Sequence, residues 1–180
     1  MERNVTMIAL FAALIAVLGL VPKIDLISGV PITAQSLGVM LCGTVLGARR
    51  GALAVLLFVF LVALGLPLLS GGRGGLGVFA GPSVGYIVGF PFAAFVAGWV
   101  TEQWRSGVGL SAFAGAILGG IVVLYAFGIP GMALVLGKSL PEAMLLAAPF
   151  LAGDIIKAGL AGFITSGIAR VRPDMVLSRS

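Results

Sequence analysis

Long apolar runs, separated by charged residues and by clusters of proline and glycine, occupy most of the chain. Six of these runs approach the ~20 residues that a helix needs to cross a bilayer, and they predict spans at residues 5–21, 31–48, 51–69, 82–100, 108–127 and 148–169. Gly128-Ile129-Pro130-Gly131 predicts a break after the fifth run. Residues 141–147 predict a short interfacial helix, with the last span beginning near Pro149. Residues 1–180 are therefore expected to form one all-α integral membrane domain with six transmembrane helices.

Composition supports this assignment and excludes several classes of protein. Hydrophobic residues make up 60% of the chain and charged residues 9%, and the mean hydropathy is +1.21, which leaves too little polar surface for a soluble domain. The net charge is +5, but the basic residues lie mainly between apolar runs, at the level of lipid headgroups, so nucleic acid is not an expected partner. With one cysteine, Cys42, and no histidine, we expect no internal disulfide, no metal site and no cofactor.

The distribution of basic residues predicts the orientation, because cytoplasmic loops of membrane proteins carry an excess of lysine and arginine. If the N-terminus is cytoplasmic, that side receives seven basic residues: Arg3, Arg49, Arg50, Arg105, Arg170, Arg172 and Arg179. The other side receives three: Lys23, Arg73 and Lys138. Both termini are therefore predicted to be cytoplasmic.

An acid and a base lie three residues apart within the last apolar run, at Asp154 and Lys157. Placing a charge in hydrocarbon costs several kcal/mol, so ionisable groups inside spans usually face a bundle interior or a water-filled site. On a helix the two residues share one face and can reach each other. Two interpretations remain open: a ligand site, or an ion pair that only holds two helices together.

Further polar side chains converge on the same extracytoplasmic half of the predicted bundle. They are Thr33, Gln35, Arg73 in a glycine-rich loop, Ser83 and Tyr86. The loop contains a formal G-x-G-x-x-G at Gly72, Gly74 and Gly77, but no strand precedes it, which argues against a dinucleotide site. The inner half of the spans is almost free of polar residues, whereas a channel or proton relay would continue polar groups across the membrane. A pocket open to the outside is the expected arrangement.

Small residues recur at four-residue spacing in the first run, at Ala9/Ala13 and Ala12/Ala16. Such residues let helix backbones approach closely in lipid. Because a terminal helix at the edge of a bundle can offer this face to another protein, the pairs are candidates for a partner surface, and internal packing is the alternative.

Three segments stand out by their sequence, order and spacing. They are Gly29-Val30-Pro31-Ile32-Thr33-Ala34-Gln35-Ser36-Leu37-Gly38, the stretch from Gly65-Leu66-Pro67 to Gly81-Pro82-Ser83-Val84-Gly85-Tyr86, and Pro149-Phe150-Leu151-Ala152-Gly153-Asp154-Ile155-Ile156-Lys157-Ala158. Together they resemble the conserved blocks of the BioY biotin transporter family. The sequence departs from the family's usual glutamine-threonine and Gly-Pro-Thr-Gly-Gly patterns at Ser36 and Ser83, which leaves the roles of these two serines open.

The resemblance implies a substrate-binding S-component of an energy-coupling factor transporter, in the cytoplasmic membrane of a prokaryote. Such a component is expected to bind biotin outside and to couple through its first helix to a transmembrane T-component and two ATPases. The chain itself lacks the G-x-x-x-x-G-K-[ST] pattern of ATP-binding loops. Lys157 is the expected partner of the biotin carboxylate, with Asp154 holding the lysine and accepting a donor from the ligand or a loop. Gln35, Tyr86 and Arg73 rank next, with unassigned roles.

Three alternatives remain at this point. The chain could act as a stand-alone facilitator, or it could be an S-component for another small vitamin. An intramembrane enzyme using Asp154 and Lys157 as acid and base is a further alternative, although we expect no enzymatic activity.

Overall fold

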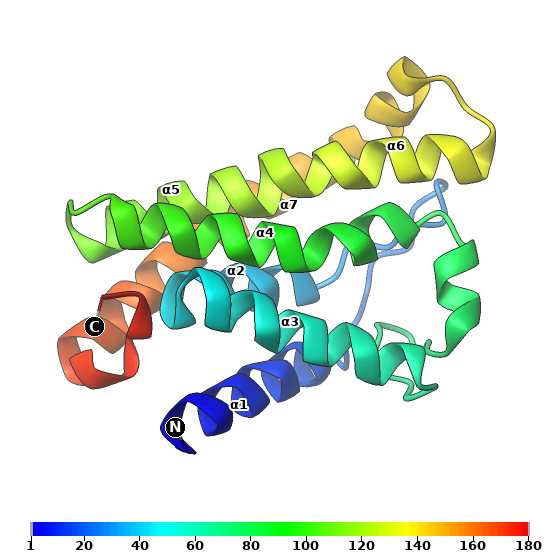
Figure 1. Cartoon of the computed structure of the whole chain (residues 1–180). Helices are drawn as coiled ribbons and strands as arrows, with labels where there is room; N and C mark the ends of the chain where they lie inside the picture. The colour runs from blue at the N-terminus through cyan, green and yellow to red at the C-terminus, as the bar shows by residue number, and fades with distance from the viewer. Residues whose placement is uncertain (1, 180) are drawn as a thin grey trace.

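The structure, a computed structural model, describes residues 2–179, and the regular elements in that range are helices. The long helices are α1 (Glu2–Leu18), α2 (Gln35–Leu46), α3 (Ala48–Ala63), α4 (Val84–Gln103), α5 (Val108–Ile117), α6 (Leu124–Leu136) and α7 (Leu140–Val171). A π-helical turn, η2 (Leu118–Val123), joins α5 to α6, and the short 3₁₀ turns are η1 (Leu76–Ala80), η3 (Pro173–Met175) and η4 (Leu177–Arg179). The long helices run back and forth, which brings both termini to one end of the molecule (Figure 1). We call this the terminal end and the other the distal end.

Helix α2 lies at the centre of the bundle. It contacts α1, α3, α4, α5 and α7, and it is buried along nearly its whole length. Glycine makes one of these contacts possible, because a Cβ on Gly43 would overlap the carbonyl of Ala94 in α4. Inside this packing, the hydroxyls of Thr44 and Thr165 are 2.9 Å apart and satisfy each other. The central helix therefore faces protein rather than lipid.

The predicted break at residues 128–131 is wrong. The segment α5–η2–α6 is one continuous helix, Val108–Leu136, of 29 residues. Pro130 lies inside it and costs one backbone hydrogen bond. Gly128 and Gly131 allow α6 to cross α4 closely and do not form a turn. A Cβ on Gly85 of α4 would lie 3.0 Å from the Cα atoms of both glycines.

The predicted separate interfacial helix at residues 141–147 is also wrong, because α7 runs through Pro149 as a single helix of 32 residues. Its true start is a capping box, in which the Glu142 carboxylate accepts the backbone N–H of Ser139 at 2.9 Å. Pro141 fits the first turn, where no intrahelical partner is lost. Ser139 and Pro141 therefore mark the N-terminus of α7 and not a separate helix.

Within residues 2–179, three helices are long and apolar enough to cross a bilayer by length and composition: Val84–Gln103, Val108–Leu136 and Leu140–Val171. The helices α1, α2 and α3 have 17, 12 and 16 residues, fewer than the ~20 of a full span. The run predicted at 31–48 becomes helical only at Gln35, because residues before it form a loop pinned by an isolated bridge between Ile24 and Ile32. Likewise, the run predicted at 51–69 ends as helix at Ala63.

Candidate ligand-binding site

A cavity of about 70 Å³ opens at the distal end, among α2, α4, α6, α7 and the loops that follow α1 and α3. All seven side chains that the sequence singled out as ligand-binding candidates line it: Thr33, Gln35, Arg73, Ser83, Tyr86, Asp154 and Lys157. Between these polar groups the wall is apolar and includes Val30, Ile87, Phe90, Leu124 and Phe150. The structure thus brings together residues that are up to 124 positions apart in the chain, from Thr33 to Lys157.

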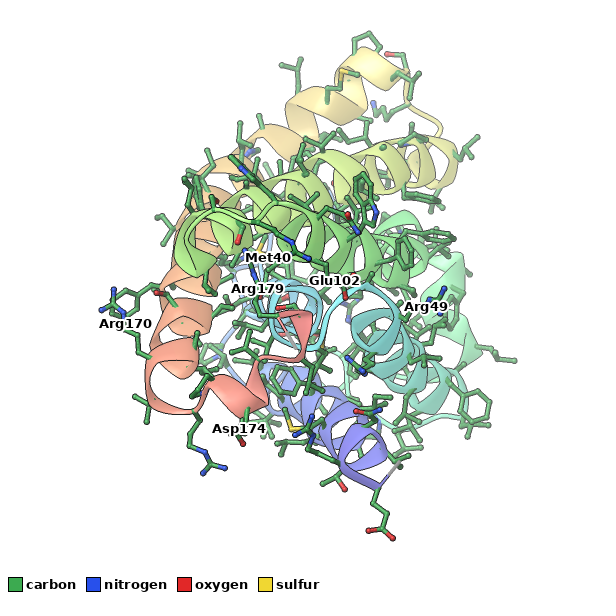
Figure 2. All side chains as sticks on the ribbon, turned by 60° about the vertical axis from the view of Figure 1, so that its left-hand side comes forward. Met40, Arg49, Glu102, Arg170, Asp174 and Arg179 are labelled. Carbon is green, nitrogen blue, oxygen red and sulfur yellow. The ribbon has the colours of Figure 1, made fainter. Side chains whose placement is uncertain are left out.

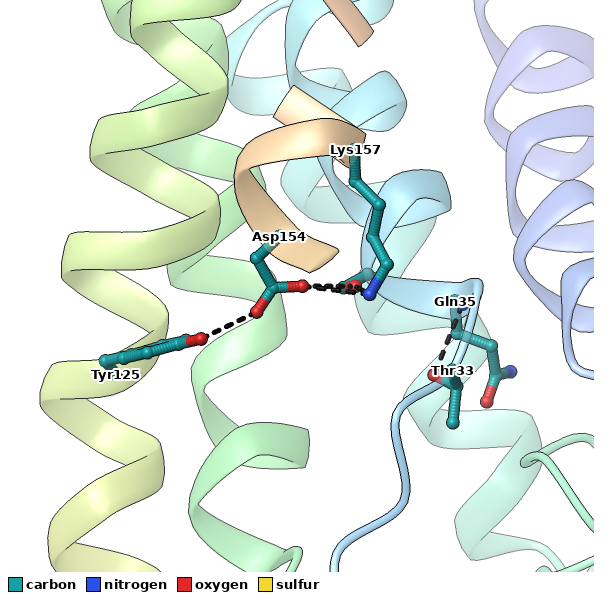
Figure 3. Close-up of polar contacts among 6 residues, drawn as sticks. Thr33, Gln35, Tyr125, Asp154 and Lys157 are labelled. Atoms are coloured by element: carbon teal, nitrogen blue, oxygen red, sulfur yellow. Dashed lines mark hydrogen bonds and ion pairs between the residues drawn. The ribbon is translucent and has the colours of Figure 1, made fainter. Parts of the chain in front are cut away.

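Asp154 and Lys157 form an ion pair on one face of α7, with 2.9 Å between Lys157 Nζ and Asp154 Oδ1 (Figure 3). Their side chains are 7% and 15% exposed, respectively. Charges this shielded need partners, because an unpaired buried charge is costly. The pair is therefore part of a larger polar network.

Two side chains complete that network, and neither belonged to the predicted ligand-binding set. Tyr125 on α6 donates its hydroxyl proton to Asp154 Oδ2 at 2.8 Å (Figure 3). Ser36, on the first turn of α2, accepts from Lys157 Nζ at 3.0 Å and donates to Asp154 Oδ1 at 3.3 Å. Both carboxylate oxygens are thus engaged, whereas the lysine ammonium, which has three donors, uses two. One N–H of Lys157 is left for a ligand.

Tyr125 could have been found from its position, since it lies two residues before the predicted outer end of the fifth run. Its orientation could not, because the π-helical turn η2 precedes it. A π-turn holds an extra residue, so the side chains beyond it are rotated by about 100° from a regular helix. The π-turn itself packs closely on α2: a Cβ on Gly120 of η2 would overlap the Met40 side chain.

Tyr86 and Ser83 contribute two hydroxyl groups to the cavity wall. Both oxygens are buried and have no hydrogen-bond partner within residues 2–179. The Tyr86 ring is held at the cavity wall by Tyr125, with ring centroids 6.2 Å apart, and by Phe150, at 5.9 Å. Because a buried, unpaired polar group costs about 1–3 kcal/mol, these hydroxyls point to a ligand that would supply their partners.

Gln35 lines the cavity, but its amide is bonded to backbone. Nε2 donates to the carbonyls of Ile15 and Leu68 at 3.1 and 3.0 Å, and Oε1 accepts the N–H of Ser70 at 3.0 Å. The side chain points away from the ion pair in Figure 3. Gln35 therefore ties the end of α1 and the loop after α3 to the start of α2. That loop carries Arg73, whose Nε donates to the Ser70 carbonyl at 3.3 Å.

The predicted partner surface on α1 is smaller than expected. Ala9 and Ala13 are exposed, as a partner surface requires. Ala12 is only 4% exposed and belongs to the hydrophobic core, and Ala16 is partly buried against it. The assignment of Ala12 to a partner surface is therefore wrong, because Ala12 lies on the buried face of α1 with Phe11 and Ile15, and α1 packs against α2 and α3.

A family model described as the BioY family matches residues 2–174. The chain belongs to the BioY family. The biotin transporter BioY of Rhodobacter capsulatus is 54% identical, with 99% of this chain and 100% of the relative aligned. The probable biotin transporter BioY of Bacillus subtilis is 41% identical, with 91% and 88% aligned. A crystal structure described as the S-component for biotin from an ECF-type ABC transporter superposes with a TM-score of 0.88 at 29% identity, covering 94% of this chain and 92% of that one.

Membership of the BioY family fits the physical character of the chain. The family is one of transporters, and the long apolar helices of this member make it a membrane protein. The expected S-component-like helical bundle is confirmed by the structural match, which extends over nearly the whole chain.

Proposed function

We propose that this chain binds biotin in the distal cavity and takes it up as the substrate-binding S-component of an energy-coupling factor transporter. The observation that carries the proposal is the buried network around Asp154, which leaves one Lys157 N–H unused beside the unpaired hydroxyls of Tyr86 and Ser83. Its BioY relatives and the matching S-component for biotin support the choice of ligand.

The cavity has polar groups and apolar walls that suit the chemistry of biotin. The carboxylate would accept the free N–H of Lys157, because a charge-assisted hydrogen bond is among the strongest that a pocket can offer. The ureido group can accept from and donate to hydroxyls, and Tyr86 and Ser83 are the unpaired ones. The apolar ring and chain would lie against residues such as Phe90, Leu124 and Phe150.

Binding requires the cavity to widen. Its volume of about 70 Å³ is below the ~300–1,000 Å³ of common small-molecule pockets. Two of its walls come from loops rather than helices, at Val30–Thr33 and at Leu69–Arg73, and loops move more easily than packed helices. The loop between α3 and η1 also has glycines at positive φ, including Gly71 and Gly72.

Six membrane crossings with both termini cytoplasmic remain our proposal for the topology. It is supported by the alternating direction of the helices and by the arginines gathered at the terminal end (Figures 1 and 2). A cysteine replacing Ile27, whose side chain is fully exposed, should react with an impermeant thiol reagent added to intact cells of a prokaryote. A cysteine replacing Arg172 should react only after lysis; the reverse pattern would place the cavity on the cytoplasmic side.

The energy for uptake would come from partners, a transmembrane T-component and two ATPases, because the chain has no ATP-binding loop. We propose that Ala9 and Ala13 form the surface that contacts the T-component. Replacing both with leucine should reduce uptake strongly and leave biotin affinity within two-fold, because these side chains are exposed and do not line the cavity. Ala12→Leu is the matched control: its buried site should instead lower thermal stability, by about 1–3 kcal/mol for overpacking.

One binding experiment tests the proposed ligand. Purified protein should bind biotin in a calorimetric titration and should not bind thiamine or riboflavin under the same conditions. Radiolabelled biotin should be recovered unchanged after incubation. Equal binding of another vitamin would contradict the assignment of biotin as the ligand. A modified product would indicate an enzyme, and uptake into vesicles that contain this chain alone would indicate a facilitator.

A further inference from the structure

A second hollow lies on the side of the bundle, between α3 and α4, with a volume of about 560 Å³. Every residue that lines it is apolar, and those on α3 are Ala52, Leu56 and Val59. Together with the α4 residues and Phe79 of η1 that complete the lining, they form what we call the lateral groove. Leu56, Phe92 and Phe95 are 50%, 51% and 43% exposed, so this apolar surface faces outward.

The groove exists because α3 and α4 touch at one end and diverge toward the other. At the terminal end the two backbones are in contact, since a Cβ on Gly98 of α4 would overlap the backbone of Ala48 at the start of α3. Toward the distal end the helices separate, and η1 spans the gap (Figure 1). Phe92 is braced from behind by a stacking contact with Phe127 of α6, with ring centroids 4.8 Å apart. The hollow is therefore held open by packed residues.

The terminal mouth of the groove carries a positive charge. Arg49 lies three residues before Ala52, on the same face of α3 as the groove residues. It is exposed and makes no hydrogen bond or ion pair with the residues that the structure describes. Trp99 lies four residues beyond Phe95 on the groove face of α4 and is 52% exposed. An arginine and a tryptophan thus flank the place where the two helices meet.

We propose that the lateral groove is a binding site for one anionic phospholipid, with its phosphate at Arg49 and an acyl chain along α3 and α4. Charge complementarity favours this occupant over a second apolar helix, which would leave the arginine unpaired. The length also fits: from Ala52 to Val59 the helix rises ~10 Å, which is within the half-thickness, ~15 Å, of a bilayer's hydrocarbon core. Tryptophan at the same level is typical of the membrane interface.

The chain provides its own reporter for this site, because its tryptophans are Trp99 and Trp104. In a Trp104→Phe background, Trp99 is the single fluorophore at the groove mouth. The full-length protein is reconstituted in phosphatidylcholine bilayers that contain phosphatidylglycerol or phosphatidylcholine brominated on the upper acyl chain. Quenching should show about a five-fold enrichment of phosphatidylglycerol at Trp99, which is the factor that one basic residue near an anionic headgroup supplies.

Two variants and one control decide the origin of the enrichment. Arg49→Gln should bring the two lipids to equal quenching, and Ala52→Phe, which fills the groove beside an intact Arg49, should do the same. Arg170→Gln is the matched control, since Arg170 is exposed at the same end of the molecule but on its opposite side (Figure 2). It should keep the five-fold preference, and melting temperatures of the variants should confirm that all are folded.

Several results would overturn the proposal. Equal quenching by the two lipids in the parent protein would remove the anionic site, and an unchanged preference in Arg49→Gln would assign it to the surface potential of the whole terminal end. Quenching by neither lipid would mean that protein, a second copy or a partner helix, covers the groove. None of these readouts uses biotin, so they are independent of the function proposed for the distal cavity.

Discussion

The two ends of the bundle both hold clustered polar side chains, but they use them differently. At the distal end, Asp154, Lys157, Ser36 and Tyr125 bond to one another. At the terminal end, two arginines bond mainly to backbone: Arg50 donates to the Leu177 carbonyl at 3.4 Å, and Arg179 donates to the Trp104 carbonyl at 2.9 Å. Arg179 also donates to the Ser111 hydroxyl, and the exposed Arg172 pairs with Asp174.

This difference indicates that the distal end is a binding site and that the terminal end is structural. Backbone carbonyls are fixed, so the side chains that bond to them hold the terminal end together, where Ser178 also donates to the Thr44 carbonyl at 2.6 Å. Two buried polar atoms at this end, Ser106 Oγ and Arg179 Nε, have no partner within residues 2–179, but neither lines the distal cavity. Side chains that satisfy one another retain unused donors and acceptors, and they can exchange partners when a ligand arrives. The distal cavity has both the unused ammonium proton and the unpaired hydroxyls, as a binding site requires.

The largest effect is expected from removing the charge of Lys157. Lys157→Met keeps most of the side-chain volume but leaves the Asp154 carboxylate without its cation, which should cost about 3–5 kcal/mol of stability. Biotin affinity should fall by about 10- to 150-fold, because a charge-assisted hydrogen bond of about 1.5–3 kcal/mol is lost. Melting curves and calorimetric titrations measure the two effects separately.

The double variant Asp154→Asn/Lys157→Met is the control for that experiment. Neutralising both partners should restore much of the stability without restoring affinity. A folded double variant that binds biotin as wild type does would show that the pair only holds helices together, and it would remove Lys157 from the binding site.

A smaller effect, confined to stability, is expected at the terminal end. Arg179→Ala removes the hydrogen bonds to the Trp104 and Ser106 carbonyls and to the Ser111 hydroxyl, and it should lower stability by about 1.5–3 kcal/mol, the range for bonds to charged groups. Biotin affinity should stay within two-fold, because this end does not line the cavity. A large loss of affinity in folded protein would contradict the division between the two ends.

Effects of similar or smaller size should distinguish Tyr86, which lines the cavity, from Tyr125, which bonds to Asp154. Tyr86→Phe removes a hydroxyl that has no partner among residues 2–179, so stability should be unchanged or raised while biotin affinity falls by about ten-fold. Tyr125→Phe removes a 2.8 Å bond to Asp154 and should lower stability by about 1.5–3 kcal/mol. If Tyr86→Phe binds biotin normally, the hydroxyl does not contact the ligand.

Several features of the site could be predicted because they depend on residue type and on the side of the membrane alone. Asp154 and Lys157 are conspicuous in an apolar run, and the alternation of spans places Tyr86 and Arg73 at the same end. Tyr125 escaped prediction because the π-helical turn before it rotates the face of α6. Similarly, a glutamine in an apolar run looks like a ligand group, and only the positions of Ile15, Leu68 and Ser70 show that Gln35 bonds to backbone.

The sequence by itself determined that this is an all-helical membrane protein with an ionisable pair in the first half of the last apolar run. Hydropathy and the cost of burying a charge can be read from composition over a window of residues. The sequence also contained the family resemblance that the comparisons confirmed. The tertiary structure alone decided that Pro130 and Pro149 lie inside helices. It also decided that Ala12 faces the core and that the α3–α4 divergence leaves a groove beside Arg49. The physical reason is common to these cases. Whether a proline, an alanine or a glycine is tolerated at a position depends on the contacts that neighbouring helices make there, and these contacts form only in the tertiary structure.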